Sequence, residues 1–351
     1  MGIKINELVK EVSRTITFEN LLNKKIAIDT FNTIYQFLAI IRQKDGTPLK
    51  DYEGNVTSHL SGLFYRTINF IEHKIKTIYV FDGTPSELKL GVIKERKQVK
   101  QEAEEKMVQA QEDEDFEEAR KFAQMTSKLD SNMIEESKKL LEFLGVPILE
   151  ASSEGEAQSA YLVNVEEAWA CASQDYDTLL FGGERLIRNF AVSRSKKVKD
   201  TTVALDIEFI SLSKLLENLK ITREQLVDMG ILIGTDFFEG IKGIGQHTGL
   251  ELIKKYGSIE NLMKEKAKIG GREILLDLDM VNQLRNIFLN PDVKKEYPKL
   301  IWGKIKYEKI EELLIEQHNF SKERVENALE RLKKLDSAKA QVSLDSFFKK
   351  S

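Results

Sequence analysis

Three mainly apolar segments of this chain each end in an acidic residue. They end at Asp29, Asp82 and Asp175, in the segments Ile26–Asp29, Ile78–Asp82 and Trp169–Asp175. An apolar run of this length is typical of a parallel β-strand buried on both faces. In open α/β sheets, ligands bind at the carboxyl ends of the strands. We therefore expect the three acids to lie together at one edge of a sheet.

Four further acids occur in short motifs of the same kind. They are Glu154 and Glu156 in Ser152–Ala157, Asp177 two residues after Asp175, and Asp236 at the end of Gly230–Asp236. Carboxylates that share a crevice repel one another and raise one another's pKa unless a cation neutralises them. Hard oxygen ligands suit Mg²⁺, with Mn²⁺ as a substitute, and such sites commonly serve phosphate chemistry.

Each acid also has a purely structural interpretation. Asp29 precedes Thr30 and a predicted helix, so it could cap that helix, and Asp82 precedes Gly83 and could form a turn. Glu154 and Glu156 could simply favour a helix N-terminus. For any one motif this alternative stays open, and only the recurrence of all the motifs in one chain favours the metal site.

Composition limits the class of protein. The chain has 351 residues, 41% of them hydrophobic, one cysteine and a net charge of -4. No apolar run is long enough for a transmembrane helix, and the start of the chain has no secretory signal, so we expect no membrane association. A single cysteine, Cys171, allows no intrachain disulfide and fits a reducing cell interior, either cytoplasmic or nuclear. Binding to DNA would have to come from local basic patches.

Predicted strands and helices alternate in the first half of the chain. We expect strands at 26–30, 77–82, 147–150, 169–175 and 185–192, and helices at 32–42, 58–73, 131–144 and 155–165. This order predicts an α/β fold with a mostly parallel central sheet flanked by helices. From about 211 the chain is helical, with helices at 211–218, 222–234, 248–256, 258–265 and 321–335. We expect one domain over 1–335 and a flexible tail over 336–351.

The segment 86–130 is highly charged. Its first part is basic, with Lys89, Lys94, Arg96 and Lys97, and its second part is acidic around Glu112–Glu118. It could be a solvated helical hairpin. Its place directly after Asp82 instead favours a cationic lid above the carboxylates that contacts a phosphate backbone.

Two other segments have features of binding sites, one for DNA and one for a partner protein. Gly240–Gly245 lies between two predicted helices, where glycines allow a close backbone approach and the next helix offers free N–H groups to DNA phosphates. The tail contains Gln341, Leu344, Phe347 and Phe348. Its apolar residues would share one face of a helical turn, which suggests a docking peptide rather than an incidental frayed end.

With these motifs in place, the chain resembles the flap endonucleases, structure-specific 5′ nucleases, and most of all their archaeal members. The resemblance covers essentially the whole chain. The most specific matching motifs are Ile26–Asp29, Val80–Gly83, Ser153–Gln158, Ala172–Gly182 and Gly234–Phe237. The chain departs from the family at Thr30–Asn32, where small residues are common, at Gln246–Gly249, where Pro and basic residues are usual, and at Ile5, where relatives often carry Gly.

The resemblance implies a set of functional residues. The seven carboxylates would bind two Mg²⁺ ions, and Lys89 and Arg96, at the base of a helical arch over about 86–130, would reach the scissile phosphate. Tyr35 would stack on a substrate base, and the helix–hairpin–helix region over about 222–265 would hold duplex DNA and a K⁺ ion bound by backbone carbonyls. The tail would bind a sliding clamp. As DNA contacts we also count Arg66, Lys94, Lys97, Lys242, Gly243 and Gly245.

We therefore predict a monomeric, Mg²⁺-dependent 5′ flap endonuclease with 5′–3′ exonuclease activity, acting in replication and repair by a two-metal mechanism. Its substrate would be branched DNA with a 5′ single strand, recognised by shape because nothing indicates base readout. Two alternatives stay open: a related 5′ exonuclease or gap nuclease, and a non-catalytic DNA scaffold docked on the clamp.

Overall fold

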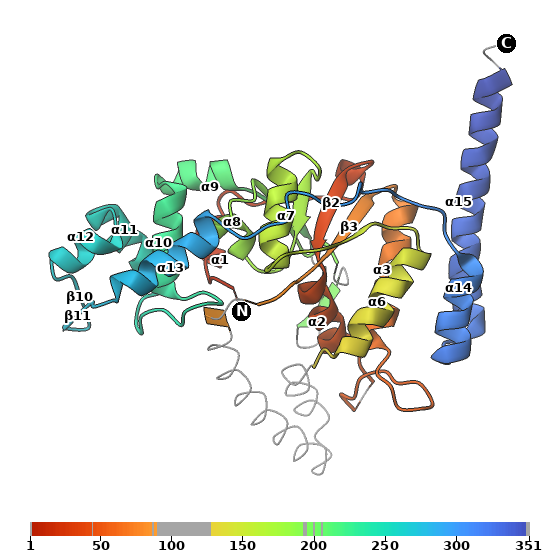
Figure 1. Cartoon of the computed structure of the whole chain (residues 1–351), viewed down its shortest axis with the longest axis horizontal. Helices are drawn as coiled ribbons and strands as arrows, with labels where there is room; N and C mark the ends of the chain where they lie inside the picture. Colours follow the sequence, from red (N-terminus) through yellow and green to blue (C-terminus); the bar gives the residue numbers. More distant parts are fainter. Residues whose placement is uncertain are drawn as a thin grey trace.

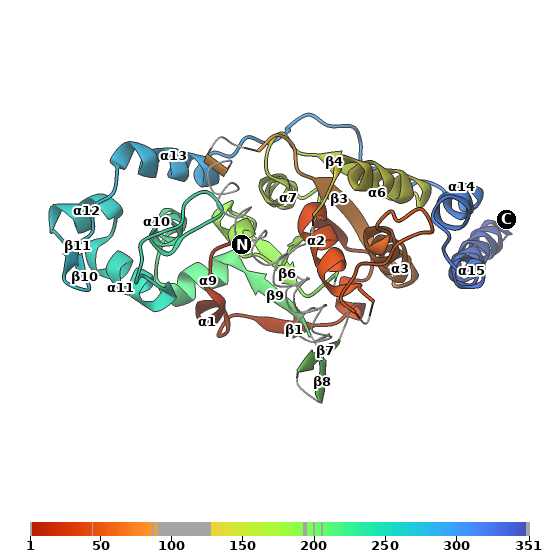
Figure 2. The same ribbon diagram turned by 90° about the horizontal axis from the view of Figure 1, so that it is seen from below.

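The computed structural model describes residues 2–43, 45–85, 88–89, 128–191, 195–198, 201–204 and 206–348. Side chains are described in these ranges except at 195–204 and 338–348. Figures 1 and 2 show a central sheet with helices on both faces, a helical region at one end and the long C-terminal helix at the other.

The central sheet has seven strands in the order β1-β9-β6-β5-β2-β3-β4. Their bounds are β1 (Arg14–Ile16), β9 (Ile207–Ser211), β6 (Arg185–Arg188), β5 (Ala170–Ala172), β2 (Lys25–Asp29), β3 (Lys76–Phe81) and β4 (Ile148–Glu150). The five strands from β6 to β4 are parallel, while β9 pairs antiparallel with both β6 and β1. The predicted mostly parallel sheet is thus confirmed, with an antiparallel edge that the sequence did not indicate.

Alternate residues of the parallel strands enter two separate cores. In β2, Ala27 belongs to one core, and Ile26 and Ile28 belong to the other. Because successive side chains of a strand point to opposite faces, a sheet covered on both sides needs apolar residues at every position. This explains why these segments are continuous apolar runs rather than alternating ones.

Helices from the first half of the chain cover the two faces. On one side lie α2 (Thr30–Ile40), α3 (Ser58–Glu72) and α6 (Ser131–Phe143), and on the other lie α7 (Gly155–Asn164) and α8 (Asp177–Leu180) (Figure 2). Short helices α1 (Asn6–Val9) and η1 (Glu19–Leu21) flank β1. The helices predicted at 32–42, 58–73, 131–144 and 155–165 are all present, within two residues at most ends.

A helical region extends from one end of the sheet (Figure 1). It consists of α9 (Leu212–Leu219), α10 (Arg223–Ile233), α11 (Gln246–Tyr256), α12 (Ile259–Lys264) and α13 (Leu278–Leu289), with the small strands β10 (Lys268–Ile269) and β11 (Arg272–Glu273). Thr222 and Gln225 form a reciprocal capping box that starts α10. Helix α13 and the small strands were not predicted.

After α13, residues 290–306 form a strap that runs back across the molecule to the C-terminal helices α14 (Tyr307–Glu311), η2 (Glu312–Gln317) and α15 (Lys322–Phe348) (Figure 1). Lys294 and Gln158 exchange two hydrogen bonds of 2.7 and 3.0 Å. Trp302 Nε1 donates to Thr77 O over 3.0 Å, and Gly303 N donates to Gly145 O over 2.8 Å. The strap is therefore attached to α7, to β3 and to the end of α6.

Other differences from the sequence prediction concern element ends. The strand predicted at 169–175 ends at Ala172, so Asp175 lies in the connection to α8 rather than in the strand. The helix predicted at 321–335 continues to Phe348. A hairpin of β7 (Ser195–Val198) and β8 (Thr201–Ala204) was not predicted. In the segment 86–130, only residues 88–89 and 128–130 are described. Among the described residues, no helix is both long and apolar enough to cross a membrane.

Candidate active site

The sheet brings three of the predicted motifs to one edge. Asp29, the last residue of β2, pairs in register with Val80 of β3, and Ile28 pairs with Ala172 of β5. Asp82 and Ser173 therefore follow directly at the carboxyl ends of the two neighbouring strands. This is the edge at which the sequence predicted a ligand site.

Asp29 and Asp82 also have structural roles: the capping role of Asp29 is the one considered from the sequence, whereas Asp82 bonds to a distant helix start rather than forming a local turn. Asp29 caps α2, where its Oδ1 accepts the N–H of Asn32 over 3.1 Å. Asp82 Oδ1 accepts the N–H of Gly155, the first residue of α7, over 2.8 Å. A β-carbon at Gly155 would come within 2.6 Å of this oxygen, which explains a glycine between Glu154 and Glu156. Capping and site formation thus coexist in the same side chains.

Glu154 and Glu156 lie at the start of α7. Glu156 Oε1 accepts from Ser173 Oγ at 2.7 Å and from Thr178 Oγ1 at 3.3 Å. Glu154 Oε2 forms an ion pair with Lys89 Nζ, whereas its Oε1 is buried and has no hydrogen-bond partner in the described structure. An unpaired carboxylate oxygen held away from water is costly, and a cation would satisfy it.

Asp177 is held by the start of the chain. Its Oδ1 accepts the N–H of Ile3 over 2.6 Å, in a buried setting. Gly2 is so close that a β-carbon there would lie 2.6 Å from Asp177 Oδ1 and 2.9 Å from Asp175 Cβ. Ile5, the departure noted in the N-terminal motif, is fully buried and immediately precedes α1. The N-terminal segment is therefore one wall of the site.

The pKa values of the carboxylates show that they share one electrostatic environment. Burial, chiefly, and the charge of Asp82 raise the pKa of Asp29 well above its usual range. Burial and the charge of Asp177 do the same for the pKa of Glu156. Burial, with Asp236 as the next contribution, raises the pKa of Asp177 to about 7. Carboxylates from all of these motifs thus influence one another at this edge of the sheet.

Among the described residues, Lys89 brings a positive charge to these carboxylates. Burial by itself lowers the pKa of an ammonium group, but the charges of Glu154, Asp82 and Asp236 outweigh it and raise the pKa of Lys89. Its Nζ also lies 5.9 Å from the centre of the Phe237 ring. The structure therefore brings Lys89 to the carboxylates, as predicted. Arg96, Lys94 and Lys97 lie outside the described residues.

The donor set suits a hard divalent cation. The oxygen atoms are carboxylate ligands of the kind that Mg²⁺ and Mn²⁺ prefer, and Glu154 Oε1 has no hydrogen-bond partner among the described residues. Across the described ranges, however, no three acidic, His or Cys side chains already form a group that could hold an ion. Three of the carboxylates instead accept from separate donors, namely the N–H groups of Asn32, Gly155 and Ile3.

Tyr35 lies beside the site on α2. Its side chain is 38% exposed, and both burial and the charge of Asp82 raise its pKa. An exposed aromatic next to the carboxylates is available for stacking on a base. Arg66, on α3, is half-buried, and its charge lowers the pKa of buried Tyr79 against the larger effect of burial.

The predicted hairpin is formed by residues 240–245 between α10 and α11. Gly240 and Gly243 have φ values of +80° and +95°, a backbone conformation that favours glycine. Lys242, Gly243 and Gly245 are exposed. Gly245 caps α11 without a side-chain hydrogen bond, so the first N–H groups of α11 are not capped by their own N-cap residue.

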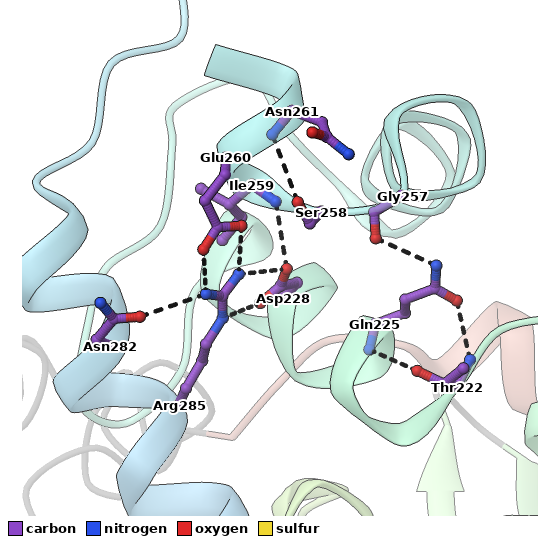
Figure 3. A network of polar contacts seen from close by, with 10 residues as sticks. All are labelled: Thr222, Gln225, Asp228, Gly257, Ser258, Ile259, Glu260, Asn261, Asn282 and Arg285. Atoms are coloured by element: carbon purple, nitrogen blue, oxygen red, sulfur yellow. Dashed lines mark hydrogen bonds and ion pairs between the residues drawn. The ribbon is translucent and has the colours of Figure 1, made fainter. Parts of the chain in front are cut away.

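A polar network fixes the helices behind this hairpin (Figure 3). Arg285 of α13 donates to buried Asp228 of α10 through Nε at 2.6 Å and Nη2 at 2.7 Å, and it also pairs with Glu260 of α12. Asp228 Oδ2 accepts the N–H of Ile259, at the start of α12. Gln225 Nε2 donates to Gly257 O at the end of α11, over 3.1 Å. Four helices are thereby held in a fixed relation.

Sequence reasoning missed two polar residues of the site. Ser173 donates to Glu156, and Asn32 contacts both Asp29 and Asp175. Asn32 belongs to Thr30–Asn32, one of the departures from the family motif, which was the available signal.

In the tail, the backbone of Gln341–Phe348 is helical, and the side chains of the proposed clamp motif lie outside the described ones.

Comparison with known proteins agrees with this architecture. Residues 1–103 match the model of the XPG N-terminal domain, and residues 145–236 match that of the XPG I-region. These two segments contain all seven carboxylates of the crevice. The fold and the site thus define a nuclease of the XPG class.

Curated relatives narrow the assignment. The chain is 47% identical to flap endonuclease 1 of Sulfolobus acidocaldarius over 98% of this chain and 99% of the relative. It is 46% identical to flap endonuclease 1 of Pyrococcus furiosus, with 100% of both covered. Among solved structures, flap endonuclease-1 from Methanococcus jannaschii matches with a TM-score of 0.73 and 36% identity over 96% of this chain and 100% of that one. The chain belongs to the flap endonuclease 1 family.

The fold is shared more widely. The catalytic core of Rad2 in complex with DNA substrate matches with a TM-score of 0.72 over 94% of this chain and 99% of that chain, at 23% identity. At that level of identity the comparison establishes the common fold alone.

Proposed function

We propose that this chain is a structure-specific 5′ nuclease that hydrolyses DNA phosphodiesters near the junction of a duplex and a 5′ single-stranded flap, in replication and repair. The observation that carries the proposal is the cluster of carboxylates that strand direction and hydrogen bonds bring to the carboxyl edge of the parallel sheet. Family membership over the whole chain supports the flap substrate.

We assign the metal ligands to Asp29, Asp82, Glu154, Glu156, Asp175, Asp177 and Asp236, holding two Mg²⁺ ions that Mn²⁺ could replace. When bound, the ions would supply a hydroxide nucleophile and neutralise charge on the reacting phosphate oxygens. The protein itself contributes the orientation of these carboxylates, through capping by Asp29 and Asp82 and through the bonds from Ser173 and Ile3.

Two side chains would act on the DNA near the metals. The Lys89 ammonium, held at Glu154, is a cation within the crevice and would stabilise negative charge on the scissile phosphate. Arg96 is assigned the same role from the family motif. Tyr35 would stack on a base at the start of the flap, since its ring is partly exposed beside Asp82. Lys94 and Lys97 of the arch, and Arg66, are further proposed backbone contacts.

Duplex DNA would bind at the hairpin formed by residues 240–245. Lys242 is exposed there, and the N-terminus of α11 offers backbone N–H groups to phosphates. Backbone carbonyls of the same turn could hold a K⁺ ion. Such contacts read the shape and charge of the duplex rather than its sequence.

We further propose that the enzyme acts as a monomer in the cell interior and docks on a sliding clamp through Gln341, Leu344, Phe347 and Phe348. The spacing of these residues in the C-terminal segment supports this partner. In an α-helix, which is the conformation of the α15 backbone, positions 344, 347 and 348 share one face.

The decisive experiment is cleavage of an end-labelled 5′ flap with Mg²⁺, with Mn²⁺ and with a chelator. We expect cleavage near the junction only when a divalent ion is present. Nicked, gapped and bubble DNA serve as competing substrates. Preference for a gap or a free 5′ end would indicate a related gap nuclease or exonuclease, and binding of flaps without any metal-dependent cleavage would indicate a scaffold.

A further inference from the structure

Asn32, in the first turn of α2, lies between two of the proposed metal ligands. Its backbone N–H donates to Asp29 Oδ1 over 3.1 Å, and its side-chain Nδ2 donates to Asp175 Oδ2 over 2.8 Å. The first bond is the ordinary capping bond of α2. The second joins α2 to the connection between β5 and α8, and it contacts a carboxylate that no strand or helix holds in place.

The orientation of the Asn32 amide is determined by its other neighbours. Its Oδ1 accepts from Gln36 Nε2, one turn further along α2, and from the backbone N–H of Gln174 at 3.4 Å. A backbone N–H can only donate, so the oxygen of Asn32 must face Gln174. The NH₂ group is therefore left on the side of Asp175, where it can only act as a donor.

Gln36 supports this arrangement from behind. Its Nε2 is engaged with Asn32, while its Oε1 is buried without a hydrogen-bond partner in the described structure. Rotating the Gln36 amide would bring its oxygen against the oxygen of Asn32, so the observed orientation is the one that keeps the pair bonded. Gln36, Asn32 and Asp175 thus form a chain in which each amide orients the next group.

We propose that Asn32 is a positioning residue for Asp175, which holds this carboxylate in its metal-binding orientation before the cation arrives. The proposal rests on the metal site proposed above. Asp175 lies near three other carboxylates, because its negative charge contributes to the raised pKa values of Asp29, Glu156 and Asp177. Without a donor beside it, repulsion would favour rotation of Asp175 away from the crevice.

The expected cost of losing Asn32 is a weaker metal site rather than a lost one. Hydrogen-bond partners that orient a metal ligand typically change metal affinity by about 10- to 100-fold when they are removed. Asn32 would not contact substrate or the reacting atoms in this role. Its effect should therefore appear in the metal concentration that the enzyme needs, and much less in the rate once the metal is saturating.

The test compares Asn32→Ala with the nearly isosteric Asn32→Asp. Mn²⁺ binding is measured by titration calorimetry on the DNA-free protein, and the Mg²⁺ concentration for half-maximal flap cleavage is measured separately. We expect both variants to bind Mn²⁺ about 10- to 100-fold more weakly than wild type. The Asp variant keeps the size of Asn but removes the donor and adds a charge beside Asp175. Gln36→Leu should have a smaller effect in the same direction, and the exposed Asn286→Asp on α13 should have none.

Each other outcome contradicts the proposal. Normal Mn²⁺ affinity in Asn32→Asp together with weak binding in Asn32→Ala would show that Asn32 acts only by filling space. Tighter binding in Asn32→Asp would show that position 32 contacts the ion directly. Unchanged affinity in both variants would show that Asp175 needs no support. If wild-type protein binds no divalent ion at all, the proposed metal site itself fails.

Discussion

The side-chain oxygen of Gln246 accepts the backbone N–H of Glu7 over 3.0 Å, which joins the first turn of α11 to α1. Helix α1 has no capping side chain of its own, because its N-cap residue is Ile5. His247 Nε2 lies 2.6 Å from the Glu7 carboxylate, and this interaction lowers the pKa of Glu7. Two residues that depart from the family motif are thus used to attach the hairpin helix to the N-terminal segment.

This attachment identifies Thr248 as the position at which to add a phosphate contact. Thr248→Lys should tighten binding to flap substrates and steepen the log–log dependence of affinity on salt by about 0.9, the value for one new phosphate contact on B-form DNA. Gln246 and His247 stay bonded to Glu7 in this variant. Affinity measured over a salt series tests it, and an unchanged slope would mean that the first turn of α11 does not face phosphate.

Removal of a proposed metal ligand should separate cleavage from binding. Asp175→Ala should slow single-turnover flap cleavage by about a thousandfold or more, since both metal placement and charge neutralisation depend on the ligand set. Flap affinity should change little, because the hairpin and the arch provide other contacts. Asp175 is the cleanest choice, since Asp82 also caps α7. Cleavage at the wild-type rate in saturating Mg²⁺ would contradict the assignment.

Deletion of residues 341–351 should abolish stimulation by the sliding clamp and preserve clamp-independent cleavage. The deleted segment contains none of the proposed metal ligands. The measurement is flap cleavage with and without added clamp, for the full chain and the shortened one. A matched variant, Phe347→Ala with Phe348→Ala, should reproduce the loss. Equal stimulation of all three proteins would rule out the tail as the docking segment.

Arg285→Met should destabilise the hairpin region (Figure 3). The substitution leaves the carboxylate of Asp228 buried without its cation, and breaking a buried ion pair from one side costs about 3 kcal/mol of unfolding free energy. Arg285→Lys should recover only part of this, because an ammonium cannot donate to Asp228 and Glu260 with the same planar geometry. Urea unfolding measures the effect, and exposed Arg272→Met is the control. A change no larger than that of the control would contradict the role given to the network.

A buried histidine predicts how stability depends on pH. His318 presents Nδ1 to Asp51 at 2.9 Å and Nε2 to Glu136 at 3.2 Å. A neutral imidazole has one N–H donor, so bonding to both carboxylates requires the charged form. Glu136, and then Asp51, raise the pKa of His318 above its ordinary value of 6.5, although burial opposes them.

The sign of the effect follows from these shifts. Because the folded pKa of His318 is raised, its contribution is complete below 6.5 and is lost as pH rises through the folded value. Burial alone would raise the pKa values of Asp51 and Glu136. Hydrogen bonds from Asn55 and His318 instead lower the pKa of Asp51 to about 2, and interactions with His318 and His59 lower that of Glu136 to about 2. Their contribution is present above their ordinary values of 3.8 and 4.5 and is lost as pH falls toward 2.

We therefore expect His318→Met to lose about 3 kcal/mol of unfolding free energy at about pH 6. The difference from wild type should shrink as pH rises through the raised pKa of His318, because the imidazole then loses its charge. Urea unfolding across this pH range measures it, with the adjacent, exposed Gln317→Met as control. A difference independent of pH would show that His318 acts by packing and not by charge.

Sequence predicted those parts of the site that depend on local pattern. The apolar runs before Asp29 and Asp82 identify buried parallel strands, and strand direction then places both acids at one edge. The short strand β1 could not be found in this way, because Arg14 and Thr15 are exposed and its residues do not form an apolar run. Its pairing with β9 depends on contacts between distant segments.

The hydrogen bonds that orient the carboxylates could not be predicted from the sequence either. Asn32 and Asp175 are 143 positions apart, and Ile3 and Asp177 are 174 apart. Nothing near Asp175 in the sequence indicates which residue will donate to it. The resemblance to a family indicated the ligands, whereas the roles of residues such as Asn32 and Gln246 became interpretable only from their contacts.

The strap over residues 290–306 has a consequence for how the chain folds. It joins the C-terminal helices to Gly145, Gln158 and Thr77, so its bonds close loops of well over a hundred residues. Contacts this far apart in sequence slow folding, because loop-closure entropy is lost before the contacts form. Helices α14 and α15 pack on α6 and α3, so they can dock only after those two helices are in place. During synthesis, α3 and α6 would therefore pack on the sheet while their own outer faces are still uncovered. The arrival of the strap, with α14 and α15, would complete the fold.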